Sequence, residues 1–206
     1  MRRNLYGGLL VAAAAALSGA DAAAQETGTP MFKAPYRAFA SHEFGGAFSD
    51  PGEGVSFALE GFYGYGRGNN DFGIRAGFAD PEGDGDTRLL LGGDFRTRIV
   101  SYSESFPLDG ALTVGAGINL GDGDDLIYLP LGVSLGRRFE LENSRTTFTP
   151  YAHPVIVPVL GAAGGDDVGF ALGLGVDLRF SQNLSLRVSG GVGDIEGVGL
   201  ALTYVR

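Results

Sequence analysis

The sequence predicts an all-β fold, namely a transmembrane, antiparallel up-and-down β-barrel of about ten strands, with eight strands as the alternative. Three observations lead to this prediction. Runs of about ten residues alternate between apolar residues and small or polar ones after the N-terminal region, which is typical of two-faced strands. The face without large apolar residues is mostly Gly, Ala and Ser. Charged residues make up only 19% of the chain, whereas a soluble surface carries about 25–35%.

The N-terminal region has the three parts of an export signal. Arg2 and Arg3 give a positive start, an apolar run follows from Leu5 to Leu17, and residues 22–24 are three alanines that suit cleavage. The apolar run is shorter than the roughly 20 residues that a helix needs to cross a bilayer. The chain has no cysteine, so a disulfide framework is excluded. We therefore expect a signal peptide at 1–24, an irregular leader at 25–36 and an outer-membrane barrel at 37–206.

Ten runs with strand-like alternation follow the leader, separated by clusters of Gly, Asp, Asn, Ser and Pro. They lie at 37–48, 55–66, 71–79, 87–99, 111–120, 126–138, 146–160, 168–180, 184–193 and 195–206. No segment after the signal has a convincing helical period. Runs of this length suit tilted strands that cross a bilayer, which take about 9–11 residues.

The stretch from Gly169 to Arg179 shows the two faces most clearly. Its even positions are Phe, Leu or Val, and its odd positions are Gly, Ala, Asp or Arg. Glycine in a strand is roughly 0.5–1 kcal/mol less favourable than alanine. A side chain at these positions must therefore destabilise the fold by more than glycine does. A crowded barrel interior explains the glycines, with the apolar face toward lipid. A soluble exported barrel, with the apolar face inward, remains the alternative.

Charged residues of the strands fall on the small-residue face and are predicted to form a lumen charge network. Its members are Glu43, Glu60, Arg75, Arg88, Asp94, Arg96, Arg98, Asp177, Arg179 and Arg187. A register slip by one residue would turn these charges to lipid, at a cost on the order of 10–20 kcal/mol. In a bore this narrow we expect the arginines and acids to pair as an internal plug. A narrow conducting pore is the alternative.

The connections between the runs differ in charge from one end of the barrel to the other. The odd-numbered connections hold thirteen acidic residues and no basic ones, whereas the even-numbered ones are mixed. With both termini in the periplasm, the acidic rim faces outside among lipopolysaccharide phosphates. The acids that could offer oxygen ligands to Ca²⁺ or Mg²⁺ at this rim are Asp84, Asp86, Asp122, Asp124 and Asp125. A solvated hairpin turn is the simpler interpretation of these acids, so no cofactor is otherwise expected.

Aromatic residues should mark the two membrane interfaces. Phe57, Phe78 and Phe170 fall near one end of their runs, while Tyr63, Tyr65, Phe72, Phe148, Phe180 and Tyr204 fall near the other. The chain ends GVGLALTYVR, in which Gly199, Leu202 and Tyr204 have the spacing of a C-terminal assembly signal. In these features the chain resembles the small bacterial outer-membrane β-barrels, the OmpA/OmpX-like and opacity-type porin-family proteins. The resemblance implies recognition of the C-terminus by the barrel assembly machinery.

No recognisable catalytic motif occurs in the chain. Its histidines are His42 and His153, in different runs; Ser41 and Glu43 flank His42, but neighbours in a strand point to opposite faces. A hydrolase would need a histidine beside both a nucleophile and a carboxylate. We therefore expect a protein that is not an enzyme. A lipid-modifying enzyme that uses His153 is the alternative from another class.

Prolines within two runs are the main anomaly. Pro130, Pro150, Pro154 and Pro158 each lack a backbone donor, and a closed barrel has no free edge to accommodate them. A local bulge or an extension beyond the membrane would explain them. The other interpretation is a lateral gap that passes a lipid or a small apolar molecule. The seventh run is also ambiguous in its faces, since both are apolar.

Together these features predict a monomeric, integral outer-membrane barrel with a structural or surface-interaction role. Its expected partners are outer-membrane lipid, lipopolysaccharide and the assembly machinery, and no nucleic acid, because the chain carries a net charge of −9. The alternatives are a narrow pore or lateral route and a lipid-modifying enzyme.

Overall fold

The computed structural model describes residues 32–37, 39–52, 55–121, 125–142, 144–161 and 167–206. The predicted signal peptide therefore lies outside the described residues, as does most of the leader. The strands are β1 (His42–Asp50), β2 (Val55–Arg67), β3 (Asn70–Pro81), β4 (Arg88–Val100), β5 (Asp109–Leu120), β6 (Leu126–Tyr128), β7 (Leu131–Gly136), β8 (Phe139–Glu140), β9 (Thr147–Leu160), β10 (Asp167–Arg179), β11 (Leu184–Gly193) and β12 (Gly197–Val205). Among these residues no helix has the length and hydropathy to span a bilayer.

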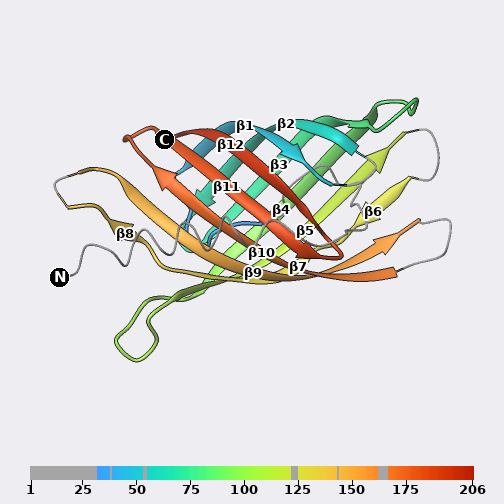
Figure 1. The fold of residues 1–206 in the computed structure, drawn as a ribbon. Helices are drawn as coiled ribbons and strands as arrows, with labels where there is room; N and C mark the ends of the chain where they lie inside the picture. Colours follow the sequence, from blue (N-terminus) through green and yellow to red (C-terminus); the bar gives the residue numbers. More distant parts are fainter. Residues whose placement is uncertain (1–31, 38, 53–54, 122–124, 143, 162–166) are drawn as a thin grey trace, which may run out of the picture.

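The strands form one closed antiparallel sheet. From β1 to β5 and from β9 to β12 each strand pairs with the next one in sequence, and the ring closes between β1 and β12, where Glu43 lies opposite Val205 and Asp50 opposite Val198. β6, β7 and β8 all pair with β9 and follow one continuous register, from Ile127 opposite Leu160 to Glu140 opposite Thr147. They are therefore three pieces of a single barrel strand. The predicted ten-stranded barrel is confirmed (Figure 1).

The strands present their large apolar residues outward. On β3, Phe72, Ile74 and Phe78 are exposed, with 64% of Ile74 accessible, whereas Asp71 and Ala79 on the other face are buried. The same alternation holds on β10, where Phe170 is exposed and Ala171 is buried. A chain that exposes this much apolar surface all around a closed sheet requires an apolar solvent, which a bilayer provides.

Aromatic rings gather toward the two ends of the barrel, as the sequence predicts. Near the end that carries the acidic connections, Phe57 contacts Phe48 and Phe78, with 6.2 Å between centroids in both pairs. Near the other end, the centroids of Phe72 and Phe95 lie 4.9 Å apart. The C-terminus lies at this second end, together with the long connection at 101–108 between β4 and β5 (Figure 1).

The first strand begins later than predicted. β1 starts at His42 rather than at residue 37, and residues 32–37 lie inside the barrel instead of in its wall. The chain turns from the interior into the wall at Ser41, where the backbone N–H groups of Ser41 and His42 donate to the carbonyl of Arg206. The C-terminal residue thus fixes the point at which the first strand starts.

The prolines of β9 do not form a bulge. The pairing of β9 with β10 keeps one register from Thr147 to Val159, and its pairing with β6, β7 and β8 keeps one register as well. The face of β9 is also settled: odd-numbered residues such as Tyr151 and Val155 are buried inside, and the prolines occupy the outward, even-numbered positions. The bulge that the sequence suggested is therefore absent from this strand.

Candidate functional site

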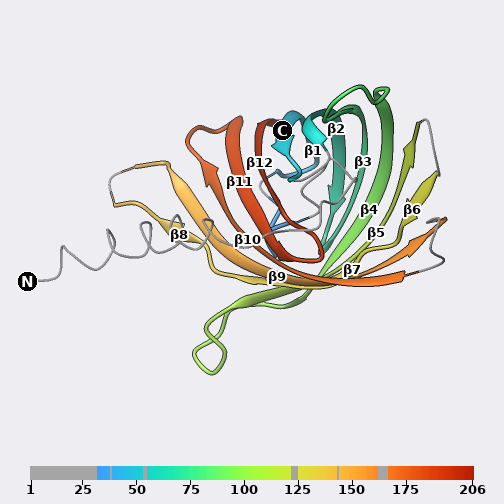
Figure 2. The same ribbon diagram turned by 45° about the vertical axis from the view of Figure 1, so that its right-hand side comes forward.

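The barrel interior is occupied by the chain's own N-terminal residues. We call residues 32–37 the lumen segment, and these residues lie within the ring of strands (Figure 2). Phe32 and Ala34 are almost completely buried. Because the segment precedes β1, which begins beside the C-terminus, it leads toward that end of the barrel. The sequence predicted an irregular leader ending at residue 36, but not that residues 32–36 lie in the lumen.

Lys33, the single lysine of the chain, is held at three atoms. Its ammonium forms an ion pair with Asp94 on β4. Its backbone N–H donates to Nδ1 of His153 on β9 at 3.1 Å, and its carbonyl accepts from the hydroxyl of Ser134 on β7. Three strands of the wall therefore fix one residue of the lumen segment.

Arg96 on β4 holds the next part of the segment. The residue is 2% exposed, and its guanidinium donates through Nε to Asp71 on β3 at 2.9 Å. Nη1 donates to the carbonyls of Ala34 and Tyr36, at 3.1 Å for Tyr36. The rigid fork of arginine suits this arrangement, since one planar group satisfies a carboxylate and two backbone carbonyls.

Tyr36 lies where the segment approaches the end of the barrel. The guanidinium carbons of Arg98 and Arg138 lie 5.7 Å and 4.6 Å from its ring centroid, which gives cation–π contacts. Burial, together with the hydrogen bond to the Asp109 carboxylate, raises the pKa of Tyr36 to about 12. Its hydroxyl therefore keeps its proton well above neutral pH and remains a donor to Asp109.

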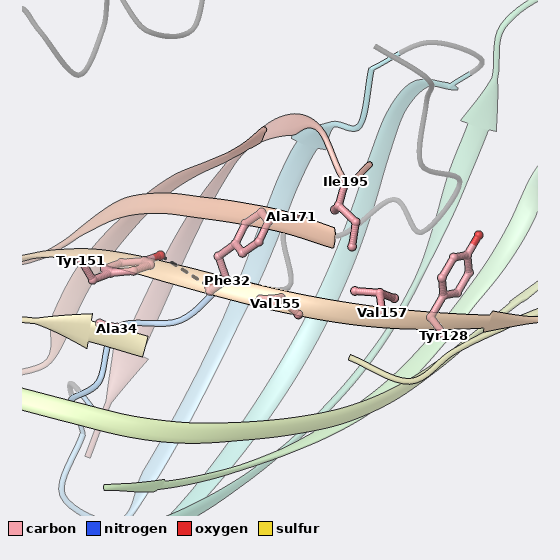
Figure 3. Close-up of a cluster of buried hydrophobic side chains, with 8 residues drawn as sticks. All are labelled: Phe32, Ala34, Tyr128, Tyr151, Val155, Val157, Ala171 and Ile195. Carbon is pink, nitrogen blue, oxygen red and sulfur yellow. Dashed lines mark hydrogen bonds between the residues drawn. The ribbon is translucent and has the colours of Figure 1, made fainter. Parts of the chain in front are cut away.

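One side of the lumen is apolar. Phe32 packs with Tyr151, Val155 and Val157 of β9 and with Ile195, which follows β11 (Figure 3). Its ring crosses the backbone at Gly173, where an added Cβ would lie 1.9 Å from Phe32 Cδ1. Gly173 thus has a specific reason, because the ring of Phe32 occupies the space that a side chain would need, whereas at Gly175 an added Cβ would lie 2.4 Å from the Tyr151 ring.

The ten predicted lumen charges all lie on strand positions that alternate with exposed apolar residues. Arg187 donates from Nε and Nη2 to Asp177, at 2.9 Å and 3.3 Å, across β10 and β11. Asp94 and Arg96 contact the lumen segment as described. Arg88 donates through Nε to Oδ1 of the Asn119 side chain at 2.8 Å.

The remaining predicted lumen residues divide between the ends and the middle of the barrel. Arg98 donates to the Asn69 side chain, and Arg179 donates to the carbonyls of Ser181 and Gln182 beyond its own strand. Glu43, Glu60 and Arg75 line a small cavity in the middle. Lys33 and Asp71 form ion pairs in the lumen but are not among the predicted lumen residues, since Lys33 lies in the predicted leader and Asp71 is the first residue of a predicted run.

His153 is 1% exposed and contacts the lumen segment on one side and β5 on the other. Since the N–H of Lys33 donates to Nδ1, the neutral ring carries its proton on Nε2, which donates to Thr113 Oγ1 at 2.7 Å. In that tautomer Nε2 cannot accept the hydroxyl proton of Thr113. The other histidine, His42, lies 2.9 Å from the Tyr63 hydroxyl through Nδ1.

The predicted metal-ligating acids do not form a visible centre. Asp84, Asp86 and Asp125 are exposed in connections, and Asp122 and Asp124 lie outside the described residues. Within the part of the chain that the structure describes, no three His, Cys, Asp or Glu side chains are grouped so as to hold a metal ion.

Comparison with solved structures gives three similar chains. The β domain of the Bordetella autotransporter BrkA has a TM-score of 0.52 at 14% identity, over 81% of this chain and all of that one. The fold is that of a transmembrane β-barrel. A bacterial polysaccharide outer-membrane secretin has a TM-score of 0.44 at 12% identity, over 74% of this chain and 57% of that one. A de novo designed transmembrane β-barrel has a TM-score of 0.40 at 16% identity, over 82% of this chain and 97% of that one.

No family model matches the chain, and no curated protein does. The resemblance to OmpA/OmpX-like and opacity-type barrels therefore stays a prediction. At 57% coverage, this chain spans little more than half of the secretin chain.

Proposed function

We propose that this protein is an integral outer-membrane barrel whose lumen is closed by its own N-terminal segment and by the lumen charge network. Its role is structural or that of a surface-interaction protein. In this proposal the chain is exported, loses residues 1–24, and is inserted as a monomer by the barrel assembly machinery. It then contacts outer-membrane lipid, with its acidic connections toward the lipopolysaccharide.

The observation that carries this proposal is the attachment of the lumen segment to opposite parts of the wall. Asp94 and Arg96 bind it from β4, Ser134 and His153 bind it from β7 and β9, and the ring of Phe32 lies against Gly173 of β10 and Gly191 of β11, on the far side of the ring from β4. A segment bound to one strand would leave room beside it, whereas these contacts span the lumen. Desolvated charges in the lumen favour this arrangement, because Lys33 and Arg96 then have acceptors for their N–H groups.

The environment of His153 supports a role without catalysis. A general base for lipid hydrolysis needs a free acceptor nitrogen beside a nucleophile. Here Nδ1 accepts from Lys33, and Nε2 is the donor to Thr113. We therefore propose that His153 positions the lumen segment, and that a lipid-modifying activity is not part of the function.

Single-channel recording tests whether the lumen segment closes the barrel. In planar bilayers, the mature wild-type chain is expected to give no steady current, whereas a variant lacking residues 25–37 is expected to conduct. The reason is that the deletion removes Phe32, Lys33 and Tyr36 from the bore and leaves the wall intact. A steady open current from the wild type would contradict the proposal, and so would a deletion variant that stays closed.

A lateral route is the second candidate, and the prolines of β9 favour it. The carbonyls of Pro150 and Pro158 accept from the backbone N–H groups of Arg137 and Leu129. The backbone groups of these two prolines therefore point toward the strand made by β6, β7 and β8. Pro154 has the same parity and faces the same edge. Three of the five even-numbered residues from 150 to 158 are therefore prolines that donate no backbone hydrogen bond to the neighbouring strand. We call this boundary, between β9 and the strand made by β6, β7 and β8, the proline seam. The seam between β9 and β10 has no such loss.

Disulfide locks distinguish the two seams, because the chain has no cysteine of its own. Ala152 lies opposite Leu135 across the proline seam and opposite Leu174 across the other one. If lipid passes laterally, the A152C/L135C lock should slow transfer of a fluorescent phospholipid between vesicle leaflets. The A152C/L174C lock should leave that rate unchanged. Equal rates in both locked variants and in the wild type would remove this candidate.

A further inference from the structure

Charged residues on the lipid-facing side of the described strands lie near the ends of the barrel, and their sign differs between the two ends. They are Asp50 and Asp80 at the end with the acidic connections, and Arg67 and Arg137 at the end with the C-terminus. Arg137 lies between β7 and β8, and the shared register of these strands puts it opposite the outward-facing Pro150 of β9. The end with the C-terminus therefore presents cations to the surrounding lipid.

Two aromatic rings hold the guanidinium of Arg137. Its Cζ lies 4.4 Å from the ring centroid of Tyr102 and 5.3 Å from that of Phe139, which are cation–π distances. Both rings are themselves held in place. Phe139 stacks on Phe148 of β9 at 5.1 Å, and the backbone N–H of Tyr102 donates to the buried Asp109 carboxylate at 3.0 Å. The cation is thus positioned before any ligand binds, which lowers the entropy cost of binding.

The N–H groups of this guanidinium remain available to a ligand. Arg137 belongs to none of the ion pairs among the described residues, in contrast to Arg96 and Arg187. Within the same residues its side chain makes no hydrogen bond. An arginine fork binds a phosphate through two parallel N–H···O bonds, and these bonds are stronger than neutral ones. The partner that this cation lacks is therefore an anion with two suitably spaced oxygens.

The surroundings of Arg137 are those of a membrane interface. Large apolar side chains are exposed at this end of the barrel, namely Ile99, Tyr102, Phe106, Phe139 and Leu141. Tyr102 and Phe106 belong to the connection at 101–108, beyond the end of the sheet (Figure 1). Aromatic side chains of membrane proteins gather at the level of the lipid headgroups. An arginine held between two such rings therefore lies at the depth of the lipid phosphates.

We propose that Arg137 binds the phosphate of an anionic phospholipid of the phosphatidylglycerol type, in the leaflet that faces the periplasm. The guanidinium donates to two phosphate oxygens, while Tyr102 and Phe139 keep it in position. This headgroup has a net negative charge, so it is attracted to an arginine that has no carboxylate partner. Basic sites at the membrane interface recognise lipid headgroups by the same attraction.

This inference rests on the proposed membrane barrel and on its orientation, which places the end with the C-terminus in the periplasm. It does not depend on whether the lumen is closed, because Arg137 lies on the outer side of the wall. The two proposals therefore fail separately. Bilayer current decides closure, whereas lipid binding by the folded barrel decides the site at Arg137.

Native mass spectrometry of the full mature chain, folded in detergent, tests the site. Phosphatidylglycerol is added in increasing amounts, and the fraction of protein with bound lipid gives the dissociation constant of the first lipid. We expect Arg137→Gln to raise this constant about fivefold, which is the contribution of one basic residue near an anionic lipid surface. Tyr102→Leu keeps the charge but removes one of the two rings, so it should raise the constant by a smaller factor.

Arg145→Gln is the matched control. Arg145 is exposed at the same end, in the connection between β8 and β9, and it takes part in no ion pair or cation–π contact of the described residues. The two arginine variants have the same net charge, so only the position of the lost cation differs. Arg145→Gln should bind phosphatidylglycerol as the wild type does. Heat-modifiable migration checks that every variant is folded.

Three results would overturn the proposal. Arg137→Gln could bind phosphatidylglycerol as tightly as the wild type, or Arg145→Gln could lose as much affinity, which would mean that net charge alone attracts the lipid. Lipid A, titrated in the same way, tests the leaflet. Tighter Arg137-dependent binding of lipid A than of phosphatidylglycerol would assign the site to the outer leaflet. In all three cases the variants would still be folded barrels, so the proposed membrane barrel would not fail with the site.

Discussion

Replacing Gly173 with leucine is expected to lower the unfolding temperature of the barrel strongly. The new Cβ would lie 1.9 Å from Phe32 Cδ1, so either the ring leaves its place or the wall is displaced. Overpacking of a dense interior typically costs about 1–3 kcal/mol and occasionally more. The loss should be near the upper end, because Phe32 also contacts Tyr151, Val155 and Val157. Heat-modifiable migration of the purified protein measures it.

Gly61→Leu is the control for this substitution. Gly61 also lies within a strand, but it is exposed on the lipid-facing side, and an added Cβ would meet nothing within 4 Å. This variant should unfold at nearly the wild-type temperature. Equal losses at Gly61 and Gly173 would show that strand glycines are needed for backbone reasons alone, and the explanation by Phe32 would then be wrong.

Arg96→Leu is expected to have the largest effect of any single charge removal. It leaves the buried Asp71 carboxylate without its cation and the carbonyls of Ala34 and Tyr36 without their shared donor. Breaking a buried ion pair by removal of one partner costs about 3–5 kcal/mol. Equilibrium unfolding in urea measures this difference in free energy.

Two further variants identify the cause of the Arg96→Leu effect. The double variant Asp71→Leu/Arg96→Leu removes the orphan carboxylate and should recover part of the lost free energy, since an apolar pair often replaces a buried ion pair without loss. Arg179→Leu should cost much less, because Arg179 bonds only carbonyls beyond the end of its strand. If Arg179→Leu is as destabilising as Arg96→Leu, the lumen segment is not anchored by Arg96.

The wall of the barrel could be predicted from the sequence because its physical requirements repeat along every strand. Alternation places Phe72 and Ile74 toward lipid and Arg75 toward the lumen, and a one-residue slip would reverse all three. Such a pattern needs no knowledge of distant contacts. The ten strands and the inward parity of the charged positions therefore follow from local sequence.

The occupant of the lumen could not be predicted in the same way. Residues 32–37 have no alternation, and their partners Asp94, Ser134 and His153 lie 61 to 120 residues further along the chain. The available signal was composition: the only lysine of the chain stands beside Phe32 and close to Tyr36, within the predicted leader. This signal could be interpreted only with the knowledge that the lumen of the barrel is filled by residues from outside its strands.

β9 shows how the lumen segment also obscured the pattern of the wall. Its inward residues Tyr151, Val155 and Val157 are apolar because they pack on Phe32, so both faces of this strand carry apolar side chains. The alternation of polarity therefore does not distinguish the lipid-facing side of β9 from its lumen-facing side. The ambiguity of this strand in the sequence is thus a consequence of the segment packed against it.

Acylation of Lys33 in isolated outer membranes tests most directly whether the lumen segment lies in the barrel. Lys33 is the only lysine, so mass spectrometry of one peptide reports its modification by a water-soluble amine reagent. Its ammonium is paired with Asp94, and only 15% of its side chain is exposed. The account predicts that the folded barrel resists modification at Lys33 and that heat-unfolded protein is modified rapidly. Equal rates in the folded and unfolded protein would contradict it.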